Sequence, residues 1–151
     1  MKALIVYDSV YGNTEKVATA VAEAIAQSAD VKALRAGEAN PSELESLDLL
    51  IVGSPTHGGR PTPAVQDFLN KVAQRSFKGI KVAAFDTRAT SKFAKIFGNA
   101  AGRIAGQLTK KGGVLVGSQE GFFVTGTKGP LKEGELERAA TWAKGVLESK
   151  K

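Results

Sequence analysis

The sequence contains no cysteine and only one histidine, His57. Without cysteine there are no disulfides, zinc–thiolate sites or thiol redox chemistry, and one histidine cannot build a multi-histidine metal centre. Any electron chemistry must therefore be carried by a bound cofactor. Long apolar runs are absent too. The first apolar segment, residues 3–7, is too short for a signal-peptide core. We expect a cytoplasmic protein without a membrane span.

Charges of one sign do not form long blocks either. Lys and Arg outnumber Asp and Glu by 21 to 15, which gives a net charge of +6, yet the only adjacent basic pairs are 110–111 and 150–151. Such an excess could favour binding to acidic partners, nucleic acid or membrane surfaces. We favour the alternative that the basic side chains are spread over a solvated surface. Nothing beyond charge supports specific nucleic-acid binding, so none is predicted.

The 151 residues, 42% of them hydrophobic, suit a single domain spanning residues 1–151. Short apolar runs of the kind found in buried parallel strands alternate with apolar stripes at helical spacing. Strands are predicted at 3–7, 31–34, 49–52, 82–85 and, as one interrupted strand, at 114–116 with 122–124; helices are predicted at 17–26, 65–72, 93–108 and 134–147. This alternation predicts an α/β, doubly wound sheet of five parallel strands with helices on both faces.

Ligands of such sheets bind beyond the carboxyl ends of the strands, so the loops that begin at residues 8, 54 and 86 are the candidate site. The loop between the first strand and the first helix reads Ser9-Val10-Tyr11-Gly12-Asn13-Thr14. Backbone N–H groups at a helix N-terminus, with the Ser9 and Thr14 hydroxyls, can hold a phosphate dianion without a cationic side chain. Gly12 lets the backbone turn closely.

The loop sequence admits other interpretations. It could be a plain strand-to-helix turn with Asn13 or Thr14 as the N-cap. A Walker loop is not supported, because no Gly-Lys-Ser/Thr follows, and the G-x-G-x-x-G dinucleotide motif is missing. A response-regulator receiver would need an aspartate at the end of the third strand, where Gly53-Ser54 stands.

The loop resembles the phosphate loop of the flavodoxin family, Thr/Ser-x-Thr/Tyr-Gly-Asn-Thr directly after the first strand. The resemblance covers essentially the whole chain, including its length, the strand–helix alternation and the Gly-Ser-Pro-Thr sequence at 53–56. It implies a flavodoxin-like sheet with strand order 2-1-3-4-5 and an FMN cofactor whose phosphate binds at residues 9–14.

The resemblance also implies two loops around the flavin ring. The first contains Ser54, Pro55, Thr56, His57 and Gly58, and the second contains Thr87, Arg88 and Ala89. Many family members carry a large aromatic residue in the first loop and a tyrosine in the second, and this chain has neither. His57 is expected either to contact the ring or to lie exposed to solvent, and Gly58 or Gly59 to turn a carbonyl toward flavin N5. The alternative is a flexible loop that leads to a helix near Pro63.

Two arginines bear on the redox potential of a bound flavin. Arg60 and Arg88, if near the ring, would favour an anionic reduced flavin and make the potential of the second electron less negative. The alternative is that both point to solvent.

Three glycines, Gly98, Gly102 and Gly106, lie one turn apart on the predicted helix 93–108. Because glycine destabilises a helix interior, we expect a neighbouring helix of the same domain to approach closely there. A dimer or partner surface, with Lys92, Lys95 and Arg103 nearby, is the alternative. The turn-rich segment 126–131 and the glutamates after it are expected to be structural.

The favoured function is an FMN-binding electron carrier that cycles through the flavin semiquinone and hydroquinone and docks on redox partner proteins, some of them acidic. A homodimer is compatible with the sequence. The alternatives are an FMN-dependent NAD(P)H:quinone-type reductase and a flavin-free interaction module on the same fold, the latter suggested by the missing aromatic residues.

Overall fold

A parallel sheet lies at the centre of the structure, a computed structural model that describes residues 1–72, 77–89, 98–126 and 128–149. Its strands are β1 (Lys2–Tyr7), β2 (Asp30–Arg35), β3 (Leu49–Pro55), β4 (Lys81–Ala89), β5 (Val114–Leu115) and β6 (Glu120–Val124). The order β2-β1-β3-β4-β5 confirms the predicted doubly wound topology. The first residues of β4 pair with β5 and its last residues with β6, so the predicted interrupted last strand is confirmed.

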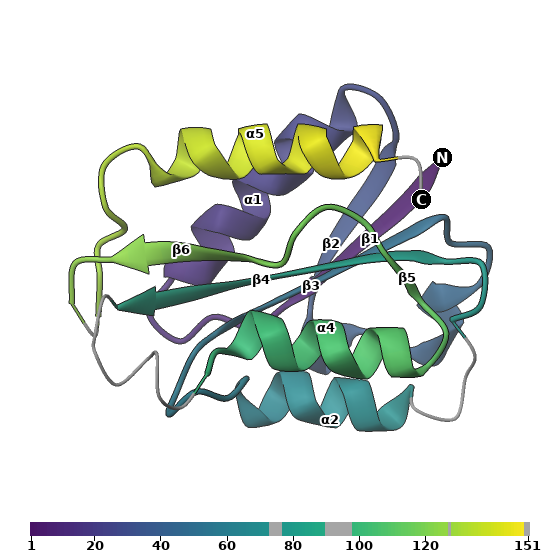
Figure 1. The fold of residues 1–151 in the computed structure, drawn as a ribbon, viewed down its shortest axis with the longest axis horizontal. Helices are drawn as coiled ribbons and strands as arrows, with labels where there is room; N and C mark the ends of the chain where they lie inside the picture. Colours follow the sequence, from purple (N-terminus) through teal and green to yellow (C-terminus); the bar gives the residue numbers. More distant parts are fainter. Residues whose placement is uncertain (73–76, 90–97, 127, 150–151) are drawn as a thin grey trace.

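The helices form a layer on each face of the sheet (Figure 1). One layer holds α1 (Asn13–Ala26) and α5 (Glu135–Glu148), which pack against each other. The other holds α2 (Pro63–Lys71) and α4 (Ala100–Lys110), and two short 3-10 helices, η1 (Ala36–Glu38) and η2 (Pro41–Leu44), connect β2 to β3. Among the described residues, none of the helices combines the length and apolarity that crossing a membrane requires.

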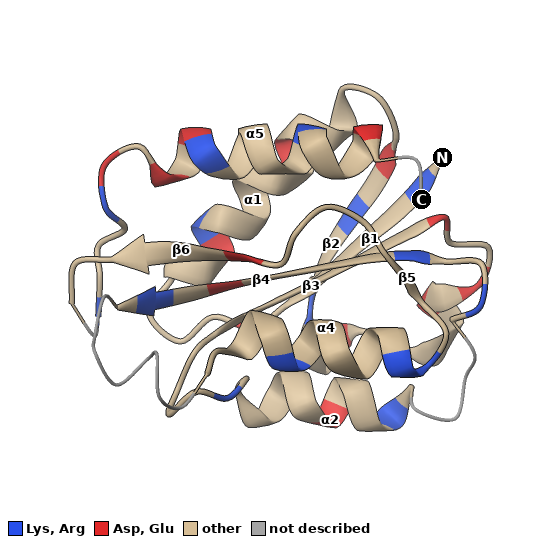
Figure 2. Cartoon of the chain, viewed as in Figure 1, with Lys and Arg blue, Asp and Glu red and all other residues tan. Residues whose placement is uncertain are grey.

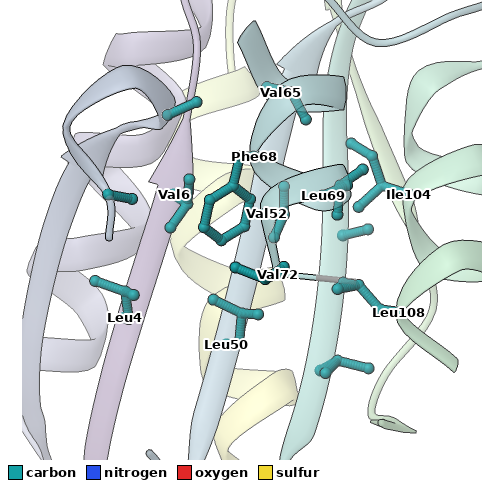
Figure 3. Packing of buried hydrophobic residues seen from close by; sticks show 14 of the residues in the cluster. Leu4, Val6, Leu50, Val52, Val65, Phe68, Leu69, Val72, Ile104 and Leu108 are labelled. Carbon is teal, nitrogen blue, oxygen red and sulfur yellow. The ribbon is translucent and has the colours of Figure 1, made fainter. Parts of the chain in front are cut away.

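The central strands are apolar on both faces because each face is covered by helices. Along β1, Leu4 and Val6 belong to the core beneath α2 and α4, whereas Ala3 and Ile5 belong to the core beneath α1 and α5. Phe68 of α2 lies beside the strand residues of the first core (Figure 3). This two-sided burial explains why β1 and β3 are continuous apolar runs rather than alternating ones.

The helix predicted over 93–108 begins later than expected. Residues 93–97 lie outside the described part of the chain, Gly98 has a φ of 81°, and Asn99 is extended. The Asn99 side chain accepts a hydrogen bond from the Gly102 N–H at 2.7 Å, so it is the N-cap and α4 starts at Ala100. Apolar periodicity that continued through residues 98 and 99 concealed this start.

The close helix approach expected at the three glycines is also wrong. Gly98 lies outside α4, and a Cβ at Gly106 would meet no described atom within 4 Å. A Cβ at Gly102 would meet only the side chains of Gln119 and Asn99. Among the described residues, no second helix therefore packs closely against Gly102 or Gly106, and the space beside Gly106 is open.

Candidate functional site

The carboxyl ends of the strands meet at one edge of the sheet, at the left of Figure 1 for β4 and β6. A cavity of about 140 Å³ lies there between the three loops singled out in the sequence. Its lining residues are Val10, Tyr11, Asn13, Thr14, Pro55, Thr56, His57, Thr87, Arg88, Ala89 and Val124. The fold thus brings together all the predicted site residues except Ser9, Gly12, Ser54 and Gly58, and adds Val124 from the end of β6.

Residues 9–14, called the phosphate loop below, turn sharply into α1. Gly12 has a φ of 93° and is the N-cap residue, so the alternative with Asn13 or Thr14 as N-cap is wrong. The Ser9 hydroxyl oxygen accepts hydrogen bonds from the N–H groups of Gly12 (3.1 Å) and Glu15 (3.2 Å). Because both lone pairs are used within the loop, its hydroxyl proton is left to donate to a ligand.

The Thr14 hydroxyl is turned to the protein instead. It shares a hydrogen bond of 2.7 Å with the Thr87 hydroxyl, which ties the phosphate loop to the end of β4. The donors that this end of α1 offers to a ligand are the backbone N–H groups of Asn13 and Thr14, because the N–H groups of the first helical residues have no intrahelical acceptor and, among the described residues, only that of Glu15 is bonded to Ser9. They lie at the positive end of the helix dipole, where an anion is stabilised.

Arg35, which the sequence analysis did not single out, supports the phosphate loop from behind. Its Nη1 donates to the Ser9 carbonyl at 3.2 Å, and its guanidinium lies 3.4 Å from the Glu15 carboxylate and 5.6 Å from the centre of the Tyr7 ring. The Tyr7 hydroxyl donates to Glu15, and burial, followed by this hydrogen bond, raises the pKa of Tyr7. The only feature that could have pointed to Arg35 is the parallel pairing of the last residues of β1 and β2, which places Arg35 beside Tyr7.

The segment before α5 also reaches the phosphate loop. The Asn13 side-chain amide donates to the Lys128 carbonyl at 3.2 Å. Gly129 has a φ of 94°, and a Cβ there would lie 2.5 Å from the Asn13 amide. The expectation of a purely structural turn at 126–131 therefore missed a contact with the candidate site, since nothing in the local sequence identifies a partner 115 positions away.

On the opposite side of the cavity, residues 57–60 form a tight turn. The N–H groups and carbonyls of His57 and Arg60 pair at 2.9 and 3.1 Å, and Gly58 and Gly59 have φ values of 59° and 79°. Two consecutive positive φ values define a hairpin turn that glycine favours. The Gly59 carbonyl accepts a hydrogen bond of 2.7 Å from Arg103 Nε, so of the two carbonyls predicted to turn toward a flavin, that of Gly58 is the one without a described partner.

Ser54 is buried and orders this loop rather than lining the cavity. Its hydroxyl oxygen accepts from the Thr62 N–H at 3.0 Å and its proton is directed to the Pro55 carbonyl at 2.9 Å. His57 is exposed, and its neighbour Thr56 uses its hydroxyl oxygen to accept from the Ala100 N–H at 3.0 Å. The turn is therefore fixed at both ends by contacts with α2 and α4.

The end of β4 carries a buried ion pair. Asp86 is fully buried, and its carboxylate accepts hydrogen bonds from Arg88 Nε (2.7 Å) and Nη2 (2.9 Å) and from the Ala101 N–H (2.9 Å). A carboxylate at the N-terminus of α4 is stabilised by the helix dipole. Since Asp86 balances the charge of Arg88, Arg60 is the one of the two predicted arginines that has no carboxylate partner among the described residues.

The chemistry of the donor set fits a phosphate monoester. Backbone N–H groups, the Ser9 hydroxyl and the Gly12 turn provide the anion site, and no Asp or Glu lines the cavity. Its 140 Å³ is less than the roughly 300–1,000 Å³ of ordinary small-molecule pockets, so a nucleotide held here would extend from it toward the surface.

Known proteins are similar to this chain in sequence or in fold. A probable flavodoxin 1 of Bacillus subtilis is 33% identical over 56% of this chain and 54% of that protein. An NAD(P)H dehydrogenase (quinone) of Azorhizobium caulinodans is 36% identical over 59% of this chain and 57% of that protein, so the chain spans about half the length of the curated relatives it matches. Oxidised flavodoxin 1 from Bacillus cereus aligns over 100% of both chains, with a TM-score of 0.85 and 21% identity, and therefore has the same fold.

The sequence pattern of a whole family provides the stronger comparison. The flavodoxin family model matches residues 5–142, which include the phosphate loop, the 57–60 turn and the end of β4. With this match over most of its length, the chain belongs to the flavodoxin family, whose members bind FMN.

Proposed function

We propose that this protein is an electron carrier that binds FMN non-covalently in the cavity between the phosphate loop, the 57–60 turn and the end of β4. One observation carries the proposal: Asn13 and Thr14, the first residues of α1, line a cavity that has no Asp or Glu among its described lining residues, at the strand ends where this fold binds its ligands. In this arrangement the protein supplies binding and electrostatics, and FMN supplies the electron chemistry.

Each loop has a separate role in the proposal. The phosphate loop holds the phosphate, with Arg35 fixing the Ser9 carbonyl behind it. Thr56 and His57 border the ring on one side, and Thr87, Arg88 and Ala89 on the other. Gly58 presents a carbonyl that can turn toward the ring because its φ is already positive and no described atom lies within 4 Å of its Cβ position.

The proposed carrier cycles through the flavin semiquinone and hydroquinone. Because no Asp or Glu is among the described residues that line the cavity, an anionic reduced flavin meets little repulsion there. Arg60 is at the end of the 57–60 turn and is not one of the cavity's described lining residues. Arg88 contributes less than the sequence suggested, since its charge is balanced by Asp86. A redox titration should give a second-electron potential less negative than that of a flavodoxin with an acidic ring site, and a strongly negative value would contradict this.

The visible absorption spectrum of the purified protein, recorded after incubation with FMN and desalting, tests the cofactor. The proposal requires a flavin spectrum at close to one FMN per chain, while a colourless product would favour the flavin-free interaction module. The same preparation can be tested for turnover of a soluble quinone with NAD(P)H. That activity is suggested by the resemblance to the Azorhizobium caulinodans NAD(P)H dehydrogenase (quinone), and rapid turnover would favour the reductase over the carrier.

A further inference from the structure

A groove of about 520 Å³ runs between α2 and α4, next to the 57–60 turn and separate from the proposed FMN cavity. Its charged lining residues are Arg60, Arg103 and Lys110, and no Asp or Glu lines it. The two helices that form its walls lie side by side on one face of the sheet (Figure 2). The groove is thus a positively charged recess beside the candidate flavin site.

Two of the cations in the groove, Arg60 and Lys110, are not neutralised by acidic side chains among the described residues. The sequence of α4 contains no acidic residue, and Asp67, the acidic residue of α2, does not line the groove. Arg60 and Lys110 form no ion pair within the described part of the chain. Residues 90–97 contribute no carboxylate either, since their sequence has no Asp or Glu.

The groove has a fixed floor and an open wall. The side-chain amides of Gln66 and Gln107 exchange two hydrogen bonds, of 3.0 and 3.1 Å, which join α2 to α4. On α4, Gly106 leaves space that a side chain would occupy, because no described atom lies within 4 Å of its Cβ position. Side chains of another molecule can therefore enter between the cations without moving the helices.

We propose that this groove is the docking surface for an acidic redox partner protein, whose carboxylates bind between Arg60 and Lys110. The inference rests on the proposed electron-carrier function. It places the partner next to the flavin, because Arg103 on the groove wall holds the Gly59 carbonyl of the turn whose His57 lines the FMN cavity. Complementary charge at such a surface speeds association and sets the orientation of the partner.

The arrangement of donors favours several carboxylates over one phosphate group. The first three N–H groups of α4 are already bonded to Thr56, Asp86 and Asn99, so this helix end offers no anion site. Arg103 and Lys110 are seven residues apart, or about 10 Å along the helix axis, so they present two separate positive charges along one face of α4. A row of acidic side chains on a protein surface matches this spacing.

Two variants change the groove without touching the FMN cavity. Lys110→Glu reverses a charge at its far end, and Gly106→Glu places a carboxylate in the open wall at a position where a side chain has room. Gly106→Ala controls for the added Cβ, and Lys144→Glu on α5 makes the same change in net charge as Lys110→Glu on the opposite layer. All four variants should bind FMN as the parent does.

The probe is cytochrome c, a basic haem protein, compared with the same protein made acidic by succinylation of its lysines. Affinity is measured at low ionic strength for the full chain before and after FMN is added, so a failure to bind FMN contradicts only the proposed function. The acidic probe should bind at least about tenfold more tightly than the basic one. Lys110→Glu and Gly106→Glu should weaken its binding about five- to tenfold, and the two controls less than about twofold.

Three results would overturn the proposal. The two forms of cytochrome c could bind equally well, or Lys144→Glu could weaken binding as much as Lys110→Glu, which would reduce the effect to net charge. The third is that NADPH binds the parent and is lost from Lys110→Glu and Gly106→Glu while the acidic probe is unaffected. The groove would then be a site for a nucleotide.

Discussion

The phosphate loop is one continuous segment, whereas the ring side of the cavity is assembled from the 57–60 turn, the end of β4 and the start of α4. The N–H groups of Gly12 and Glu15 donate to the Ser9 hydroxyl oxygen within the loop and the first turn of α1, and single contacts from Arg35 and Thr87 tie the loop to the sheet. The ring side depends on the buried Asp86 carboxylate, which joins Arg88 at the end of β4 to Ala101 at the start of α4. Substitutions in the loop should therefore change FMN affinity, and those on the ring side should first change stability.

The largest effect is expected on the ring side, for Asp86→Asn. Arg88 would lose the partner of a buried ion pair and α4 the carboxylate at its N-terminus, so the free energy of unfolding should fall by about 3 kcal/mol. Denaturant unfolding measures this change. Exposed Asp67→Asn is the control and should cost less than about 0.5 kcal/mol.

A double variant separates the charge from the hydrogen bonds. Adding Arg88→Met to Asp86→Asn removes the unpaired charge and should recover part of the lost stability. If Asp86→Asn were as stable as the parent, the view that the buried Asp86 carboxylate holds the ring side together would be wrong.

Glu135→Gln tests whether the phosphate side also depends on distant contacts. Glu135, at the start of α5, accepts from the Phe123 N–H at 2.7 Å and pairs with Arg138, whose hydrogen bond lowers the pKa of the glutamate. The variant should lose about 2 kcal/mol near neutral pH. A lowered pKa stabilises the fold above the ordinary value of 4.5, so the difference should shrink as the pH falls through the lowered value.

Unfolding curves recorded from neutral pH down to about pH 3 measure this difference, since the loss begins only below the ordinary value of 4.5. A difference that grows on acidification would contradict the assigned role of Glu135. If FMN affinity also falls, the contact between Asn13 and the segment before α5 contributes to the phosphate side.

Gly12→Ala should act mainly on ligand binding. The φ of 93° costs a non-glycine residue about 1–2 kcal/mol, although the added methyl has room. Relaxation of this strain would misalign the first N–H groups of α1, and the dissociation constant for FMN should rise about tenfold. Gly145→Ala in α5, where the added methyl also has room, is the control and should leave that constant unchanged. Equal FMN affinity for Gly12→Ala and the parent would contradict the role given to the turn.

Arg35→Met should have the smallest effect. It removes the donor to the Ser9 carbonyl and a partly exposed cation, so FMN affinity should fall roughly threefold with little change in stability. Arg35→Lys should restore part of the affinity if charge is what matters. Titrations with FMN at low and high salt measure both, and an effect larger than that of Gly12→Ala would reverse the proposed order.

The difference between the two sides also explains what the sequence could predict. The phosphate loop and the strand order follow from local turn chemistry and apolar periodicity, both of which lie within short windows. Arg35 could not be found in this way, because its place depends on the register between β1 and β2. The start of α4 was missed because the cap bond of Asn99 outweighs an apolar period that runs on through Gly98.

The pairing of Arg88 with Asp86 was within reach of sequence reasoning. Residues two apart on a strand point to the same face, so a carboxylate and a guanidinium at 86 and 88 can meet. The sequence did not show that Asp86 is buried. Burial makes this ion pair stronger than a surface pair, and Asp86 also bonds to the start of α4.

The most direct test of the account compares the affinity of the protein for FMN with its affinity for riboflavin, which lacks the phosphate. If the N–H groups of α1 and the Ser9 hydroxyl hold the phosphate, each hydrogen bond to that charged group contributes about 1.5–3 kcal/mol. FMN should then bind at least about a hundredfold more tightly than riboflavin. Equal affinities would contradict the assignment of residues 9–14 as the phosphate anchor.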